Sequence, residues 1–232
     1  MPELDAPNIR QLELFKEMDG THFDALMRAS YVQNFPPQLE LISEGDPSDF
    51  LHVVVSGCVE LFSSWNGRES TLAVIRPVST FILAASIRNG PYLMSARTLE
   101  KSRIILIPSQ DVRAVFDKDP KFARAIVEEL AQVCRNATKH TKDLKLRTAL
   151  ERLANYLLTQ QKQAGNGSNF SIPIEKRHLA SLLGMTPENL SRALKKLRAY
   201  GVLVDGQIIA ISKQEELERL AKPNRLIDDA SL

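Results

Sequence analysis

Three polar residues near the C-terminus, Glu188, Ser191 and Arg192, are spaced so that a helix would place them on one face. A carboxylate can accept a hydrogen bond from the amino group of cytosine, and an Arg guanidinium can bond both O6 and N7 of guanine. A Ser hydroxyl can bond either a base or a phosphate. The same spacing also fits an ordinary solvent-exposed helix face, so the neighbouring elements must decide between the two interpretations.

These residues lie in a stretch that has the pattern of two helices joined by a tight turn. We expect helices over residues 176–183 and 187–200, with Gly184 in the left-handed conformation that such a turn requires. Thr186 suits the N-cap of the second helix, and Pro187 suits its first position. The apolar side of that helix would pack inward through Leu190, Ala193, Leu194 and Leu197.

The chemistry around this motif favours a nucleic-acid partner. Residues 141–232 hold 15 Lys and Arg against 10 Asp and Glu, a net charge of +5, whereas the whole chain carries +2. The side chains expected to contact the DNA backbone, which gives affinity and position rather than sequence choice, are Thr186, Lys176, Lys195 and Lys196. A hairpin expected over residues 202–211 would make the motif a winged helix-turn-helix.

The N-terminal half has a different texture. Short β-rich runs alternate with turn signals over residues 32–108, which indicates an antiparallel barrel or sandwich. Asn66–Gly67 predicts a hairpin, and Ser56–Gly57 marks another turn. Capping boxes are expected at Thr21 with Asp24 and at Ser212 with Glu215. Other helices are expected within residues 8–31, 109–116, 147–161 and 213–221, and the tail 222–232 is expected to fray.

A long helix expected from Pro120 carries apolar positions at alternating spacings of three and four residues, as a dimeric coiled coil requires. A helix packed on its own domain needs a similar stripe, and self-association is the interpretation we favour. His140 on this seam is either a pH- or ligand-sensitive residue or a tolerated polar one. The expected dimer positions are Ala123, Ile126, Leu130, Val133, Ala137, His140 and Leu144.

Several classes of protein are disfavoured. The two cysteines, Cys58 and Cys134, are far apart, and no His/Cys cluster has metal-ligand spacing, so we assign no metal site. No apolar run approaches the roughly 20 residues of a membrane helix, and the N-terminus does not resemble a secretory signal. We therefore expect a cytoplasmic protein without a membrane partner. No recognisable catalytic constellation or P-loop is present, which argues against an enzyme.

Taken together, residues 12–221 resemble the cyclic-AMP receptor protein/FNR (CRP/FNR) family of bacterial transcription regulators. The stretch "ISEGDPSDFLHVVVSGCVELF" is similar to the family's β-roll signature, and "PENLSRAL" matches the Glu-x-x-Ser-Arg pattern of the FNR branch. The resemblance implies an α+β chain: a cyclic-nucleotide-binding-like β-roll over 1–118, a dimerisation helix over 119–146 and a winged helix-turn-helix over 147–232. It also implies a homodimer that reads a TTGAT-like palindrome in double-stranded DNA and works with RNA polymerase.

The departures from the family bear on the signal. Where cyclic-nucleotide binders carry Gly-Glu and then Arg-Ser or Arg-Thr, this chain has Ile82–Leu83 and "PYLMS", so we do not expect tight cyclic-AMP binding. Arg97 is nearby, at a strand position typical of a solvated Arg. The N-terminal cysteine cluster of FNR is missing, so an iron–sulfur cluster is not expected. Haem is a candidate cofactor by similarity to the nitrogen-oxide-responsive branch, without an assignable ligand among His22, His52, His140 and His178.

Three hypotheses follow. The leading one is a dimeric, sequence-specific activator in a redox or nitrogen-oxide circuit, whose effector is unassigned. The second is a regulator of the same family that responds to a cyclic nucleotide or another small molecule through an altered pocket. The third, from a different class, is a regulatory or scaffold module whose helix-turn-helix contacts protein rather than DNA.

Overall fold

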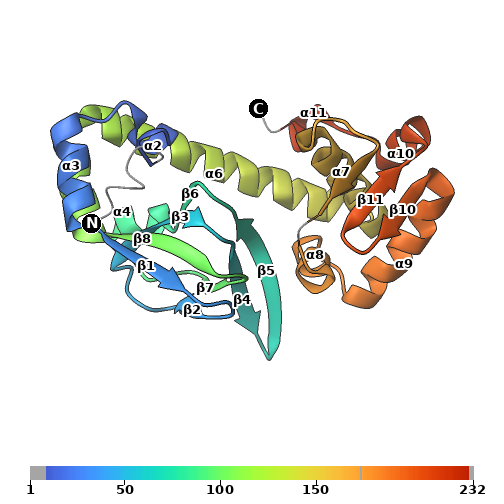
Figure 1. Cartoon of the computed structure of the whole chain (residues 1–232), viewed down its shortest axis with the longest axis horizontal. Coiled ribbons are helices and arrows are strands. Elements are labelled where there is room, and N and C mark those ends of the chain that lie inside the picture. The colour runs from blue at the N-terminus through green and yellow to red at the C-terminus, as the bar shows by residue number, and fades with distance from the viewer. Residues whose placement is uncertain (1–8, 173, 230–232) are drawn as a thin grey trace. The chain divides into compact units, whose positions relative to one another are not determined.

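The computed structural model describes residues 9–172 and 174–229 (Figure 1). The chain divides into two compact units, Met1–Val133 and Cys134–Leu232, and the division falls inside the long helix α6, Pro120–Leu146. Within the described residues, no helix combines the length and the apolar composition of a transmembrane span.

The first unit is built around two antiparallel four-stranded sheets, with strand orders β1-β8-β3-β6 and β2-β7-β4-β5. Sequence-distant strands are neighbours in both sheets, so the chain rolls the two sheets over one another. This confirms the antiparallel β architecture expected from the short strands and close turns. The strands are β1 Tyr31–Phe35, β2 Glu40–Ile42, β3 Phe50–Ser56, β4 Val59–Trp65, β5 Arg68–Ile75, β6 Ser79–Phe81, β7 Ser95–Thr98 and β8 Ser102–Pro108.

The two predicted turns are confirmed. Asn66 and Gly67 both have positive φ values, of 50° and 74°, between β4 and β5, as a two-residue hairpin turn requires. Gly57 has a φ of 91°, and a Cβ at this position would lie 2.6 Å from the Cα atom of Ser102. A side chain at position 57 would therefore collide with the start of β8.

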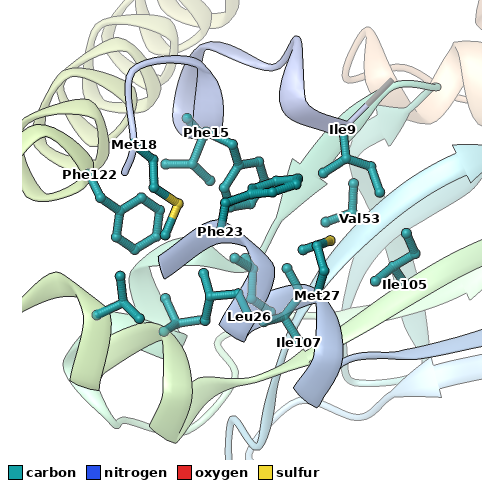
Figure 2. Close-up of a cluster of buried hydrophobic side chains, with 14 of the residues drawn as sticks. Ile9, Phe15, Met18, Phe23, Leu26, Met27, Val53, Ile105, Ile107 and Phe122 are labelled. Atoms are coloured by element: carbon teal, nitrogen blue, oxygen red, sulfur yellow. The ribbon is translucent and has the colours of Figure 1, made fainter. Parts of the chain in front are cut away.

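Alternation along β3 separates two apolar clusters. Leu51 and Val53 face a group of helices, whereas Val54 faces the interior of the roll. The first cluster joins β3 and β8 to α2 (Glu13–Lys16), α3 (Gly20–Ala29), α5 (Ser109–Phe116) and the start of α6 (Figure 2). The second fills the roll with Ile42, Val54, Val59, Leu61, Phe81, Tyr92, Ala96 and Ile104.

Aromatic rings hold the helices of the first cluster together. The ring of Phe15 stacks on that of Phe122 with centroids 5.9 Å apart and meets the edge of Phe23 at 6.0 Å (Figure 2). Asp119 ties the same helices by hydrogen bonds, because its Oδ1 accepts from the backbone N–H groups of Lys121 and Phe122. Its Oδ2 accepts from the backbone N–H of Asp19, the N-cap of α3. One carboxylate thus caps α6 and joins it to α3.

Both predicted capping boxes are wrong. Helix α3 begins before Thr21, because the Oδ1 of Asp19 accepts from the backbone N–H of Thr21 at 2.8 Å and caps the helix instead. Helix α10, Gln214–Ala221, has Lys213 at its N-cap without a side-chain cap. The Ser212 hydroxyl instead donates to the carbonyl oxygen of Gly201 at 3.1 Å. In α3 the side chain of Asp19 thus caps the helix in place of Thr21. Before α10 the carbonyl oxygen of Gly201 accepts the hydrogen bond of the Ser212 hydroxyl, which was predicted to cap that helix.

The second unit packs helices around a three-stranded sheet of order β10-β11-β9. Its apolar core draws on α7, α8, α9 and α10 and on all three strands. Residues 225–228 form a helix, so this part of the tail predicted to fray is ordered, whereas 230–232 lie outside the described residues. The elements are α7 Ala149–Gln163, β9 Asn169–Ser171, α8 Lys176–Leu182, α9 Pro187–Leu197, η2 Arg198–Tyr200, β10 Val202–Asp205, β11 Ile208–Ile211, α10 Gln214–Ala221 and α11 Arg225–Asp228.

Candidate nucleic-acid interface

Helices α8 and α9 form the tight two-helix motif that the sequence predicts. Gly184, in the turn between them, has a φ of 63°. A Cβ at that position would lie 2.8 Å from the Cδ2 atom of Leu144, near the end of α6. The turn therefore needs glycine both for its left-handed backbone and for its close approach to α6.

The start of α9 is capped as expected. The Thr186 hydroxyl oxygen accepts a hydrogen bond from the backbone N–H of Asn189 at 3.3 Å, and Pro187 occupies the first turn. The predicted hairpin, β10 with β11, follows the helix after η2 and pairs Asp205 with Ile208 across its turn. The second unit therefore contains a winged helix-turn-helix.

Helix α9 has one buried side and one exposed side. Leu190, Ala193 and Leu197 are buried in the core of the second unit. The structure places all three predicted base-reading residues, Glu188, Ser191 and Arg192, on the exposed side. The predicted backbone-contacting residues Thr186, Lys176, Lys195 and Lys196 are also exposed. Other exposed residues of α8, α9 and η2, not predicted from the sequence, are Arg177, Asn189 and Arg198.

Glu188 is poised to remain a carboxylate. Its own backbone N–H, the Thr186 hydroxyl and the nearby charge of Arg192 hold the pKa of the Glu188 carboxyl below its ordinary value. An ionised carboxylate has only acceptor sites, which suits a cytosine amino group and excludes a guanine carbonyl. The exposed face of α9 thus combines Glu188, which can only accept hydrogen bonds, with Arg192, which can only donate them, one helical turn apart.

A residue that sequence reasoning missed supports this motif from behind. Arg152, on α7, is only 9% exposed, and its Nε donates to the carbonyl oxygen of Leu183 at 2.8 Å. Leu183 is the C-cap of α8 and directly precedes Gly184 in the turn. In the sequence Arg152 directly follows Glu151 among apolar residues, and no local signal shows which carbonyl groups it contacts.

The first unit departs from the cyclic-nucleotide signature at two positions. Leu83, where the family signature would place an acid, is buried in the apolar cluster that joins the sheets to the helices. Arg97 is not the solvated residue that we expected, because its Nε donates to the buried carboxylate of Glu60 at 2.7 Å. Its Nη2 donates to Glu69 at 2.9 Å, and its guanidinium lies over the ring of Phe62. Two carboxylates already neutralise this cation, so it is not free to balance a cyclic phosphate.

The four histidines lie in unrelated places. His52 is buried beside Phe81, with ring centroids 4.8 Å apart, and burial lowers the pKa of its imidazole to about 4. His178 is buried in α8 and accepts a hydrogen bond from Arg177, His22 contacts Asp119, and His140 is exposed. Across residues 9–172 and 174–229, no group of three or more His, Cys, Asp or Glu side chains is placed to hold a metal ion.

One predicted seam position needs correction. Ile126 is completely buried, because it packs into the helical cluster of the first unit beside Phe122. Its side chain is therefore already covered within one chain. The neighbouring Val127, which the sequence argument left out, is 60% exposed, and Val133 is 53% exposed.

Comparison with known proteins agrees with this architecture. Residues 32–119 match the cyclic nucleotide-binding domain, and residues 151–220 match the Crp-like helix-turn-helix domain. The chain is 30% identical to the cyclic AMP receptor protein of Thermus thermophilus, over 75% of this chain and 81% of that protein. It is 24% identical to a CRP-like cAMP-activated global transcriptional regulator of Mycobacterium tuberculosis, over 90% of this chain and 96% of that one.

Solved structures show the same fold. FixK2 from Bradyrhizobium japonicum superposes with a TM-score of 0.73 at 24% identity, over 84% of this chain and 98% of that one. The matches to transcription regulators span both units, the β-roll and the winged helix-turn-helix, and these relatives belong to a non-enzyme family. The chain therefore belongs to the CRP/FNR family of DNA-binding transcription regulators.

Proposed function

We propose that this chain acts as a homodimer that binds a TTGAT-like palindrome, with one α9 helix in the major groove of each half-site. The observation that carries the proposal is the exposed Glu188, Ser191 and Arg192 face at the capped N-terminal half of α9. The N-terminal half of a recognition helix is the part that contacts base edges. A helix whose polar face only contacts solvent would not require the Thr186 cap, the tight turn at Gly184 and the hydrogen bonds of the buried Arg152 to that turn.

In this proposal the three side chains have separate roles. Arg192 donates to O6 and N7 of a guanine, Glu188 accepts from the amino group of a cytosine, and Ser191 contacts a base or a phosphate. Lys176, Lys195 and Lys196, with Thr186, contact the phosphate backbone and supply affinity that depends on salt. A scaffold that bound protein instead of DNA would not require side chains suited to base edges with lysines suited to phosphates around them.

Dimerisation is proposed to use α6 in a register shifted from the one that the sequence favoured. Ile126 is buried within the chain, so the proposed seam passes through the exposed Val127 instead. The other seam positions follow from Val127 at alternating spacings of three and four residues. The charged residues of this stretch, among them Glu128, Arg135 and Lys139, fall outside these positions. The proposed seam consists of Ala123, Val127, Leu130, Cys134, Ala137, Thr141 and Leu144.

The signal is proposed to be a redox or nitrogen-oxide signal and the output activation. Relatives include the "Transcriptional activator protein anr" of Pseudomonas aeruginosa, 22% identical, and the "Nitrogen fixation regulation protein FixK" of Rhizobium meliloti, 22% identical. The alternative is a small molecule in an altered pocket, and two relatives are named for cyclic AMP. The neutralised Arg97 and the apolar roll interior argue against a cyclic phosphate.

The DNA part of the proposal is tested by fluorescence anisotropy on a labelled TTGAT palindrome and on a scrambled duplex of equal composition. We expect the palindrome to bind at least about 10³-fold more tightly at physiological salt, as specific sites do. Equal affinity for both duplexes would contradict the proposal. Calorimetric titration with cyclic AMP is the matching test of the sensor, and micromolar or tighter binding would contradict the account of the roll interior.

A further inference from the structure

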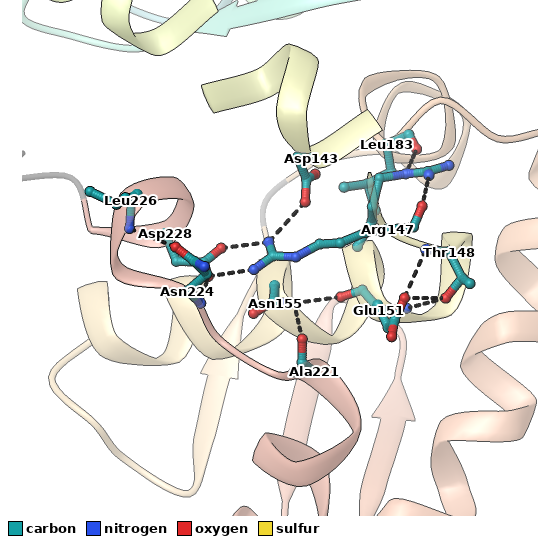
Figure 3. Close-up of polar contacts among 11 residues, drawn as sticks. Asp143, Arg147, Thr148, Glu151, Asn155, Leu183, Ala221, Asn224, Leu226 and Asp228 are labelled. Carbon is teal, nitrogen blue, oxygen red and sulfur yellow. Dashed lines mark hydrogen bonds and ion pairs between the residues drawn. The ribbon is translucent and has the colours of Figure 1, made fainter. Parts of the chain in front are cut away.

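A network of polar side chains lies at the joint between α6 and α7. Figure 3 shows its centre, where Arg147 lies between Asp143 and Asp228. Next to it along the chain, the Nε of Arg152 donates to the carbonyl oxygen of Leu183. All of these residues belong to the second unit. The network joins the end of α6, the start of α7, the helix-turn-helix turn and α11.

Arg152 connects the ends of two helices. Besides its bond to Leu183, it donates to the carbonyl oxygen of Arg147, just after α6, at 2.8 Å, and to that of Gly184 at 3.3 Å. Carbonyl groups at helix C-termini carry a partial negative charge, so they can stabilise a buried cation. Arg152 therefore holds the end of α6 against the turn that aims α9.

Arg147 is fixed from the other side. Its side chain is 7% exposed, and its two terminal nitrogens contact the two carboxylate oxygens of Asp228 at 2.7 and 2.6 Å. Its Nη1 also donates to Asp143, one helical turn earlier, at 2.9 Å. A two-pronged contact of this kind fixes orientation as well as distance. The backbone carbonyl that Arg152 uses is therefore itself held in place by α11.

The segment 221–229 is attached at several further points. The Nδ2 of Asn155 donates to the carbonyl oxygen of Ala221 at 2.6 Å, and Lys222 pairs with Glu151 at 3.2 Å. Lys139 on α6 donates to the carbonyl oxygen of Asp229 at 2.7 Å. The match to the helix-turn-helix family model ends at residue 220, so these contacts come from chain that lies past the matched motif.

We propose that residues 222–229 form a C-terminal clasp, and that Arg147, Arg152 and Asp228 are positioning residues that hold α9 at a fixed orientation to the end of α6. The inference rests on the proposed dimeric DNA binding. When one α9 helix of the dimer is bound to its half-site, the other binds the second half-site at an effective concentration. That concentration depends on how rigidly each α9 is attached to α6. A closed clasp makes the dimer selective for one half-site spacing, and an open clasp relaxes that selection.

The test compares Asp228→Asn with the wild type on three duplexes: the palindrome, the same palindrome lengthened by two base pairs, and a single half-site. Asparagine keeps the shape of the side chain and removes the charge that pairs with Arg147. We expect palindrome affinity to fall about tenfold, the scale of typical coupling between sites. Affinity for the single half-site is expected to stay unchanged, and the preference for the correct spacing to shrink.

The matched control is Arg225→Gln, which breaks the pair between the exposed Arg225 of α11 and Asp229, the C-cap of that helix. Exposed pairs contribute little, so this variant should behave as the wild type. A second variant that ends the chain after Lys222 should reproduce the effect of Asp228→Asn. If palindrome and half-site affinities fall in parallel, or if neither falls, the clasp does not position α9 and the proposal is overturned.

Amide hydrogen exchange separates this proposal from the proposed function. We expect Asp228→Asn to speed exchange in residues 147–152 and 183–186, whether or not DNA is bound. If the wild-type protein showed no preference for the palindrome, the DNA proposal would fail while faster exchange still supported the clasp. Unchanged exchange in these segments would overturn the clasp whatever the DNA result.

Discussion

At the scale of single residues, the exposed face of α9 sets a carboxylate one helical turn from a guanidinium, Glu188 before Arg192. Hydrogen bonds from its own backbone N–H and from the Thr186 hydroxyl lower the pKa of Glu188, and the attraction of Arg192 at this spacing adds to them. The chemistry of this face could be predicted from sequence alone, because residues four apart on a helix are neighbours in any fold.

The lowered pKa of Glu188 leads to a prediction about pH. A depressed pKa keeps the carboxylate ionised to a lower pH than an ordinary Glu, so its contribution to base discrimination should be constant from about pH 8 to pH 5. The measurement is the difference in discrimination against a substituted base pair between the wild type and Glu188→Gln. Subtracting the Glu188→Gln value from the wild-type value removes the effects of groups other than Glu188 that titrate over the same pH range. A difference that decays between about pH 6.5 and pH 5 would contradict the assignment.

Other residues of the site could not be predicted, because their partners are distant in sequence. Arg152 bonds Leu183 and Gly184, about 30 positions away, and Asp228 bonds Arg147 across 81 positions. Neither pairing leaves a periodic or local pattern. Asp19 is a milder case: an Asp before a helix is a recognisable cap, but Thr21 two residues later offered an equally good pattern.

At the scale of elements, α6 shows where periodicity alone is ambiguous. Apolar residues occupy both 126 and 127, so two registers of alternating spacing fit the same stretch. Burial in the first unit removes Ile126 from any exposed seam, because Ile126 packs in the cluster of Phe122 and Val127 does not. The turns at Gly57, Asn66–Gly67 and Gly184 were predictable, since each is determined by residues next to it in sequence.

The two neighbouring positions on α6 should behave differently when changed. Ile126→Ala should lower the free energy of unfolding by about 2–5 kcal/mol, as a buried truncation does, and leave the dimer intact. Val127→Asp should keep the fold and yield monomers, because like charges would face each other across the proposed seam. Thermal unfolding and analytical ultracentrifugation measure these outcomes.

Glu128→Ala, on the charged side of α6, serves as the control and should change neither property. Cross-linking gives an independent readout, because Cys134 is exposed and Cys58 is buried. Mild oxidation of the wild type should trap a disulfide-linked dimer through Cys134, and Cys134→Ser should prevent it. The seam would be wrongly assigned if Ile126→Ala dissociated the dimer and Val127→Asp did not.

Asp119 joins α3 to the start of α6 and should be important for the first unit. Burial alone would raise the pKa of its carboxyl, but backbone N–H donors from Asp19 and Phe122, with His22, outweigh burial and lower it. Asp119→Asn should therefore cost about 2 kcal/mol of unfolding free energy near neutral pH, the upper range for a helix cap.

The sign of the pH dependence follows from the lowered pKa. A carboxyl with a folded-state pKa below its unfolded value stabilises the protein above that unfolded value, near 4, and loses the stabilisation as pH falls further. The difference in unfolding free energy between the wild type and Asp119→Asn should thus shrink as pH falls below about 4. Chemical denaturation over a pH series measures it, and a difference that grows on acidification would count against this role.

At the scale of the whole molecule, charge is unevenly distributed along the chain. The net charge of +5 in residues 141–232 sits on a chain with +2 overall, so the remaining residues carry −3. The positive charge of the C-terminal part favours its approach to DNA phosphates, and the negative charge of the remaining residues disfavours theirs. The α+β architecture was predictable at this scale, because the change from short strands to long helices shows in the sequence itself.

The most direct test of the account is a specificity profile for the wild type and Arg192→Ala. Anisotropy titrations would use palindromes in which each base pair of the TTGAT half-site is substituted in turn. The wild type should lose about 1–3 kcal/mol for each contacted pair, and Arg192→Ala should weaken binding by a similar amount while becoming indifferent to the base at one guanine position. An Arg192→Ala profile with the same discrimination as the wild type at every position would contradict the claim that this face of α9 reads DNA.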